Sequence, residues 1–122
     1  MDIEYLEIVT RDVEGTCATL SAVHSVSFGA PEPGFGNARM ALLGTGGRLG
    51  VRAPLSESEG APLVRPYLRV ADIEAAIASA EASGADVAMR ATEIAGHGKF
   101  AIYFQGGIQH GVWEVPAGSG TE

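Results

Sequence analysis

The feature that most constrains the fold is a strand-helix-strand pattern in the second half of the chain, Arg65–Glu114. A short apolar run, Pro66–Val70, precedes an amphipathic segment that begins at Asp72 and ends before Gly84. Asp is a favourable helix N-cap and Gly a common helix stop, so this segment is predicted to be a helix. Three more strands follow it in the prediction, at Ala85–Met89, Phe100–Phe104 and His110–Val115. The order is therefore β-α-β-β-β.

The first half of the chain repeats this pattern. Asp12-Val13-Glu14 corresponds to Asp72-Ile73-Glu74, and Gly50-Val51 to Gly111-Val112. Chance similarity between two ordinary strand-helix units is the alternative, but the strand, helix and hairpin signals recur in the same order. A unit this short cannot cover its own sheet, so two copies are expected to complete one domain. The predicted organisation is module 1 (3–53), a connector (54–64), module 2 (65–115) and a flexible tail (116–122).

Composition excludes several classes of partner. The net charge of −7 and the pI near 4.8 argue against nucleic acid and anionic membrane surfaces, which both need clustered Lys and Arg. No apolar run approaches the length of a membrane-spanning helix, and the N-terminus does not resemble a signal peptide. Cys17 is the only cysteine, which excludes an intrachain disulfide. We therefore expect a cytoplasmic protein with no nucleic-acid or membrane partner.

Two such copies in about 120 residues resemble the vicinal oxygen chelate superfamily. This group includes glyoxalase I, the extradiol dioxygenases, and the fosfomycin- and bleomycin-resistance proteins. The resemblance is carried by Glu7–Glu14, Tyr67–Ala76 and Gly98–Glu114. It implies an α+β fold in which two tandem βαβββ modules form curled mixed sheets around an open cleft, and it implies a homodimer. In the family, that cleft often holds a divalent metal that chelates neighbouring oxygens of the substrate.

The resemblance places metal ligands on the first and last strands of each module, here Tyr5, Ala53, Arg65 and Glu114. Only Glu114 is an ordinary divalent-metal ligand. Ala53 has no donor atom in its side chain, and the fixed positive charge of Arg65 would repel a cation. We therefore expect no metal site of the family type and no cofactor, although Zn, Mn, Fe or Ni remains a possible cofactor.

The candidate ligand-binding residues follow from the same positions. Arg65 is expected either to pair with Glu114 across the cleft floor or to bind an anionic or carbonyl-bearing ligand. Trp113 alternates away from Glu114, so it is expected on the outer face or at a subunit contact. The full set of ligand-binding candidates is Tyr5, Glu7, Arg65, Tyr67 and Glu114.

Three residues are candidates for catalysis. His97 lies in the loop Gly96-His97-Gly98 and His110 lies just before the last strand, so each could transfer protons at the cleft. An exposed loop histidine and a structural turn residue are the simpler interpretations of these two. Glu114 is the third candidate, as a carboxylate near them.

Two functions compete at this stage. The favoured one is a small-molecule-binding protein that lacks the metal and sequesters its ligand, as the bleomycin-resistance branch does. The alternative is a glyoxalase- or dioxygenase-like metalloenzyme, a lyase or oxidoreductase, with a metal held by Glu114 and helped by Glu7, His110 or His97. The acidic candidates suit a cationic ligand and Arg65 suits an anion, so the sequence leaves the charge of the ligand open.

Overall fold

The computed structural model describes residues 1–117, which form two compact units. The N-terminal unit is Tyr5–Val64; the C-terminal unit is Met1–Glu4 together with the chain from Arg65 onward. The first four residues join the C-terminal unit because Arg69 donates its backbone N–H to the Asp2 carbonyl at 2.8 Å and its guanidinium to Glu4. The predicted tail (116–122) lies outside the described residues from position 118 onward.

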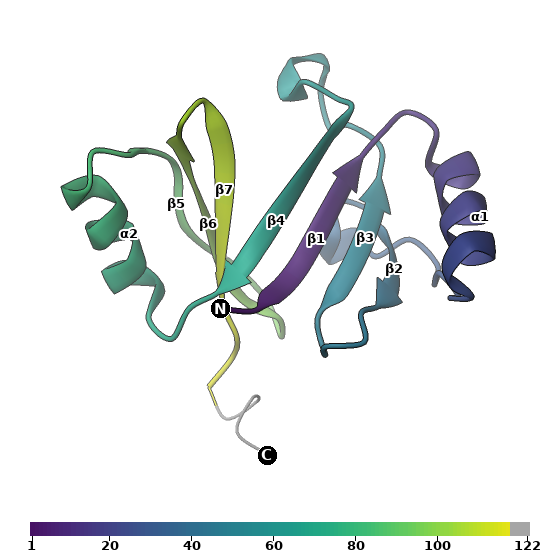
Figure 1. Cartoon of the computed structure of the whole chain (residues 1–122), viewed down its shortest axis with the longest axis horizontal. Coiled ribbons are helices and arrows are strands. Elements are labelled where there is room, and N and C mark those ends of the chain that lie inside the picture. The colour runs from purple at the N-terminus through teal and green to yellow at the C-terminus, as the bar shows by residue number, and fades with distance from the viewer. Residues whose placement is uncertain (118–122) are drawn as a thin grey trace. The chain divides into compact units, whose positions relative to one another are not determined.

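The N-terminal unit contains one helix and three strands among its described residues (Figure 1). Its strand order is β2-β3-β1, with β3 parallel to β1 and antiparallel to β2. The elements are β1 (Ile3–Val9), α1 (Val13–His24), the 3-10 turn η1 (Pro33–Phe35), β2 (Arg39–Leu42), β3 (Arg48–Arg52) and the 3-10 turn η2 (Glu57–Glu59). Asp12 begins α1 as predicted, since its carboxylate accepts the Gly15 N–H at 3.0 Å.

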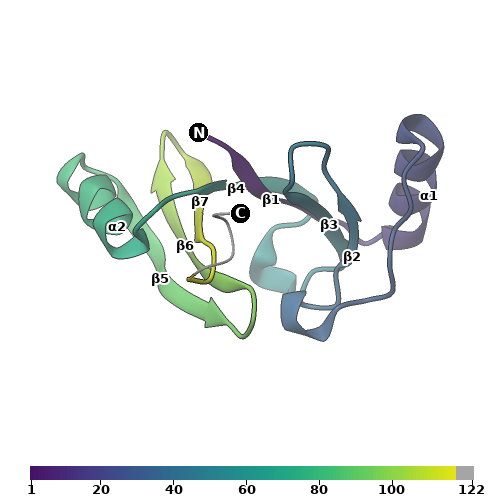
Figure 2. The same ribbon diagram turned by 90° about the horizontal axis from the view of Figure 1, so that it is seen from below.

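The C-terminal unit has the full predicted β-α-β-β-β order. Its strand order is β4-β7-β6-β5, and only β4 and β7 run parallel within it. Helix α2 lies along one face, where Ile73 and Ile77 pack against Ala101 and Val112 (Figure 2). The elements are β4 (Leu63–Arg69), α2 (Ile73–Ala82), β5 (Asp86–Ile94), β6 (Gly98–Gln105) and β7 (Ile108–Glu114). Across residues 1–117 this confirms the α+β class.

The N-terminal copy differs from the prediction by one strand. Among the described residues, β5 has no counterpart there, and only an isolated bridge between Glu32 and Ala38 takes its place. The segment 29–36 that would supply the strand contains Pro31 and Pro33. Proline has no N–H to donate to a neighbouring strand, so this segment folds as a loop around η1 instead.

The two copies share one register between their first and last strands. Glu7 lies opposite Gly50 in β1–β3, and Tyr67 lies opposite Gly111 in β4–β7. A Cβ on Gly50 would come 2.0 Å from the Tyr5 hydroxyl, and one on Gly111 would come 2.4 Å from the Tyr67 ring. Glycine is required at both places because a tyrosine from the first strand lies over the last strand.

Gly98 offers a test of how β6 is held against β7. Its φ of +107° and the Glu114 carbonyl oxygen, 2.1 Å from a built Cβ, both disfavour any side chain. Gly96 has a φ of +79° but nothing within 4 Å of such a Cβ, which makes it a matched control. We expect Gly96→Ala to lower the free energy of unfolding by about 1 kcal/mol and Gly98→Ala by roughly 3 kcal/mol or more. Urea titration of both variants measures this, and equal losses would contradict the close approach.

Candidate functional site

Strand register decides which side chains of the C-terminal unit share a face. In β4–β7, Tyr67 lies opposite Gly111 and Arg69 lies opposite Trp113. Because side chains alternate along a strand, Arg65 lies on the same face as Tyr67 and Trp113. This face is the one opposite α2, and the candidate site of this unit lies on it.

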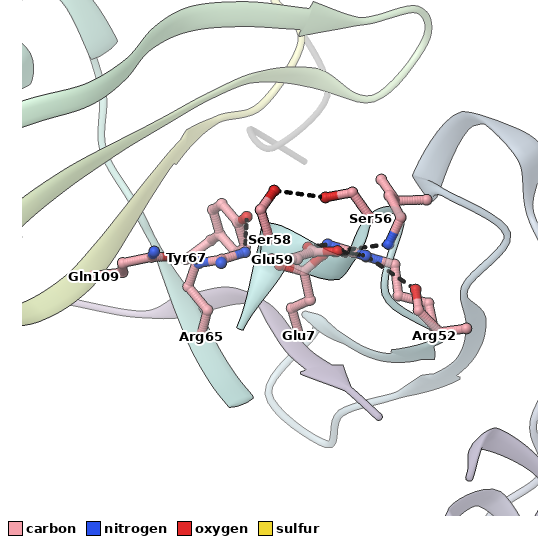
Figure 3. Close-up of polar contacts among 10 residues, drawn as sticks. Glu7, Arg52, Ser56, Ser58, Glu59, Arg65, Tyr67 and Gln109 are labelled. Carbon is pink, nitrogen blue, oxygen red and sulfur yellow. Dashed lines mark hydrogen bonds and ion pairs between the residues drawn. The ribbon is translucent and has the colours of Figure 1, made fainter. Parts of the chain in front are cut away.

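Arg65 is fixed on this face by two neighbouring side chains. The residue is 5% exposed. Its Nε donates to Gln109 Oε1 at 2.7 Å, and its Nη1 donates to the Tyr67 hydroxyl at 3.3 Å (Figure 3). Sequence reasoning did not single out Gln109; the available signal was its position two residues before Gly111, on the same face of β7. A buried guanidinium held in this way has a defined orientation.

An aromatic cluster supports the same face. The Tyr67 ring meets Trp113 edge-on at 5.6 Å and Phe100 at 5.9 Å, and Phe100 stacks on Trp113. Trp113 is 3% exposed, and its Nε1 donates to the His97 carbonyl at 2.9 Å. The prediction that Trp113 lies on the outer face or at a subunit contact is therefore wrong: the parallel register turns it toward Tyr67.

Glu114 lies on the opposite face of this sheet from Arg65. It alternates with Trp113 and shares the α2 side with Val112. Its Oε1 accepts the backbone N–H of Ile73, the first residue of α2, at 2.9 Å. A carboxylate there satisfies one unpaired donor of the helix and complements the positive end of the helix dipole. The expected ion pair between Arg65 and Glu114 is thus corrected, while a ligand-binding or catalytic role for Glu114 stays a prediction.

The two histidine candidates lie apart from Arg65. His110 lies on the α2 side of β7, where its ring stacks on Tyr103 at 5.1 Å and its Nε2 contacts the Gln105 carbonyl at 3.1 Å. His97 holds its loop through its backbone, with its N–H on Ile94 and its carbonyl on Trp113. These contacts are structural, and catalysis by either imidazole stays a prediction.

The N-terminal unit carries a buried charge cluster on its own strand face. The register of β1–β3 places Tyr5, Glu7 and Arg52 on one side. Glu7 is 6% exposed and Arg52 5%. Arg52 Nε donates to Glu7 Oε2 at 2.8 Å, and its two Nη groups donate to the Glu59 carboxylate, Nη1 at 3.0 Å (Figure 3). Ligand binding by Tyr5 and Glu7 stays a prediction.

The charges within this cluster depend on each other. Burial alone would lower the pKa of the Arg52 guanidinium, but its hydrogen bonds to Glu59 and Glu7 and the charges of both carboxylates raise that pKa above its ordinary value. The guanidinium is therefore permanently charged. Sequence reasoning found Glu7 but missed Arg52 and Glu59, which lie far from it along the chain and form no recognisable motif.

The register also tests whether this face suits a metal. On the last strands, the residues that share a face with Tyr5 and Arg65 are Arg52 and Trp113, one position before Ala53 and Glu114. The placement of ligand positions on Ala53 and Glu114 is therefore corrected. Neither Tyr5 with Arg52 nor Arg65 with Trp113 supplies an imidazole or carboxylate. Within residues 1–117, no group of three or more His, Cys, Asp or Glu is arranged to hold a metal ion. These residues do not fit a divalent metal.

Comparison with known proteins identifies the fold. No protein-family model matches the sequence, and no curated protein sequence matches it. Three solved structures are similar: methylmalonyl-CoA epimerase from Mycobacterium tuberculosis (TM-score 0.71, 17% identity, covering 93% of this chain and 87% of that one); a hypothetical protein from Bacillus halodurans (0.73, 14%, 94% and 94%); and Streptomyces coelicolor methylmalonyl-CoA epimerase in complex with 2-nitronate-propionyl-CoA (0.66, 14%, 94% and 97%). The chain has the vicinal oxygen chelate fold. The resemblance seen in the sequence is confirmed at the level of fold.

Some expectations about the setting of the protein remain predictions. Homodimer formation and cytoplasmic location are among them. In the part of the chain that the structure describes, no helix is long and apolar enough to cross a membrane.

The position of Glu114 predicts a structural effect of its substitution. Glu114→Ala removes the acceptor for the Ile73 N–H, so we expect it to lower the free energy of unfolding by about 1 kcal/mol. Glu114→Gln keeps an acceptor oxygen and should lose less. Chemical denaturation of both variants measures this order. If both variants are as stable as the parent protein, the carboxylate does not support α2.

Proposed function

We propose that the protein binds a small anionic or carbonyl-bearing molecule without a divalent metal. The observation that carries this proposal is the guanidinium of Arg65 at a first-strand position where the family resemblance implies a His or Gln metal ligand. A guanidinium repels cations, and its N–H groups form a planar fork that matches a carboxylate. The chemistry of this position therefore changes from binding a cation to binding an anion.

The surroundings of Arg65 support recognition rather than chelation. Gln109 and Tyr67 fix the direction of its guanidinium, and Trp113 and Phe100 hold the Tyr67 ring. A polar group whose orientation is set in advance loses less conformational entropy when it binds a ligand. These neighbours are suited to a ligand that offers one carboxylate or carbonyl and an apolar body beside it.

The similar structures and the charge of the chain narrow the ligand class. The Streptomyces coelicolor epimerase was crystallised with 2-nitronate-propionyl-CoA, an acyl compound. The net charge of −7 here opposes a ligand with many negative charges, since long-range repulsion slows its approach. We therefore propose small monocarboxylates and acyl carbonyl compounds as ligands of this protein.

The role of Arg65 is tested by Arg65→Met, with Arg90→Met as the matched control. Arg90 is an exposed arginine of β5 that pairs with Glu81. Calorimetric titration with a panel of small monocarboxylates and of amines of equal size should find carboxylate ligands. Loss of one charge-assisted recognition group should weaken their affinity by about 10- to 100-fold in Arg65→Met and leave Arg90→Met unchanged. Tighter binding of the amines, or equal affinities in both variants, would contradict the proposal.

Independence from metal is tested on the same ligands. We expect their affinities to be unchanged after chelator treatment and after equilibration with Zn, Mn, Fe or Ni, because neither strand pair supplies a metal ligand set. Elemental analysis of each sample should find no stoichiometric ion. One tightly held divalent ion per chain would instead favour the alternative, a glyoxalase- or dioxygenase-like metalloenzyme, and lyase and dioxygenase assays would follow.

A further inference from the structure

Arg52 is held in place by the core of the N-terminal unit. It lies at the end of β3, opposite Val9 of β1, where register fixes its backbone. Its Nε bonds to Glu7 of β1 at 2.8 Å. A Cβ on Gly36, which follows η1, would come 3.2 Å from Arg52 Cδ, so the aliphatic part of the side chain lies under that turn. The guanidinium is thus positioned by β1, β3 and η1.

Glu59 reaches this guanidinium from a different kind of segment. Residues 54–60, which we call the strap, contain the short turn η2 and are exposed except at Pro54 and Glu59. Glu59 inserts its carboxylate against both Nη groups of Arg52, and its Oε1 also accepts the Leu55 N–H at 2.7 Å (Figure 3). Segments with little buried apolar surface are among the first to open in a folded protein.

The strap's other ion pair gives a contrast within the same turn. Glu57 pairs with Arg11 at 3.2 Å, but the two side chains are 90% and 65% exposed. Such pairs contribute little to stability because water and salt screen them. The Glu59 side chain is 15% exposed, and that of Arg52 is 6%. The attachment of the strap through charge therefore depends on Glu59.

From this geometry we propose that Arg52 is an anion-binding group occupied by the protein's own carboxylate, Glu59, and that small carboxylates compete with Glu59 for it. The two oxygens of Glu59 meet the two Nη groups as a carboxylate ligand would. Exchange of one carboxylate for another keeps the buried guanidinium paired, which avoids the large cost of leaving it alone. Glu59 leaves with the strap, whereas Glu7 stays bonded to Nε.

This inference rests on the proposed function for its ligand class, monocarboxylates, but it concerns a different arginine in the other unit. It assigns the strap a second role, as a cover that opens when a ligand takes the place of Glu59. The two ideas fail separately, because Arg65→Met tests the first and substitutions at Glu59 test the second.

The test compares Glu59→Ala with Glu57→Ala. Removing the Glu59 side chain vacates the two Nη groups of Arg52 while Glu7 remains on Nε, so formate and acetate should bind in its place. We expect both salts to raise the melting temperature of Glu59→Ala saturably, relative to sodium chloride of the same ionic strength. Glu57→Ala should show no such rise. If the two variants respond alike, the proposal is overturned.

A second variant keeps the proposal testable if Glu59→Ala does not fold. Glu59→Gln keeps the side chain but loses its charge, and Glu57→Gln is its control. Amide hydrogen exchange of residues 54–60 should be faster in Glu59→Gln by about tenfold or more, the factor for one lost charge-assisted hydrogen bond. Acetate should not slow this exchange, because it replaces Glu59 without holding the strap. Exchange no faster than in Glu57→Gln would show that Glu59 does not hold the strap and would overturn the proposal.

Discussion

The parallel pairing of the first and last strands in each unit is the constraint on which the other features depend. In both units the paired strands bring a tyrosine over a glycine, Tyr5 over Gly50 and Tyr67 over Gly111. A slip of one residue would turn every side chain of the last strand to the other face. The glycines prevent this, since any other residue there would collide with the ring. Arg52 and Trp113 therefore face the first strand, while Ala53 and Glu114 do not.

Much of the fold could be predicted because its signals are local. The caps Asp12 and Asp72, the helical spacing after them and the glycine turns all lie within a few residues of what they determine. The strand missing from the N-terminal copy was not foreseen, because the repeat suggested a complete unit and the prolines at 31 and 33 were treated as part of a connecting loop. A pattern shared by two halves shows common design, and each half still obeys its own backbone chemistry.

The candidate site was harder to predict, because it depends on contacts between distant residues. Sequence alignment of the two copies matched Arg52 to Trp113 correctly, but it could not tell whether those residues or their neighbours face the first strand. Only the register decides this. Gln109 and Glu59 were missed for the same reason: each reaches an arginine from another segment and carries no motif of its own.

Both units place a buried guanidinium where the family resemblance implies the surroundings of a cation. A metal ion gathers oxygen ligands from any direction its coordination allows, and it can be removed by a chelator. A guanidinium gathers oxygens only in its own plane, cannot be lost, and stays charged at all physiological pH values. In the N-terminal unit those oxygens are the carboxylates of Glu7 and Glu59; in the C-terminal unit they include Gln109 and Tyr67. Recognition built this way depends on side-chain geometry, so its specificity is set by the residues that orient each arginine.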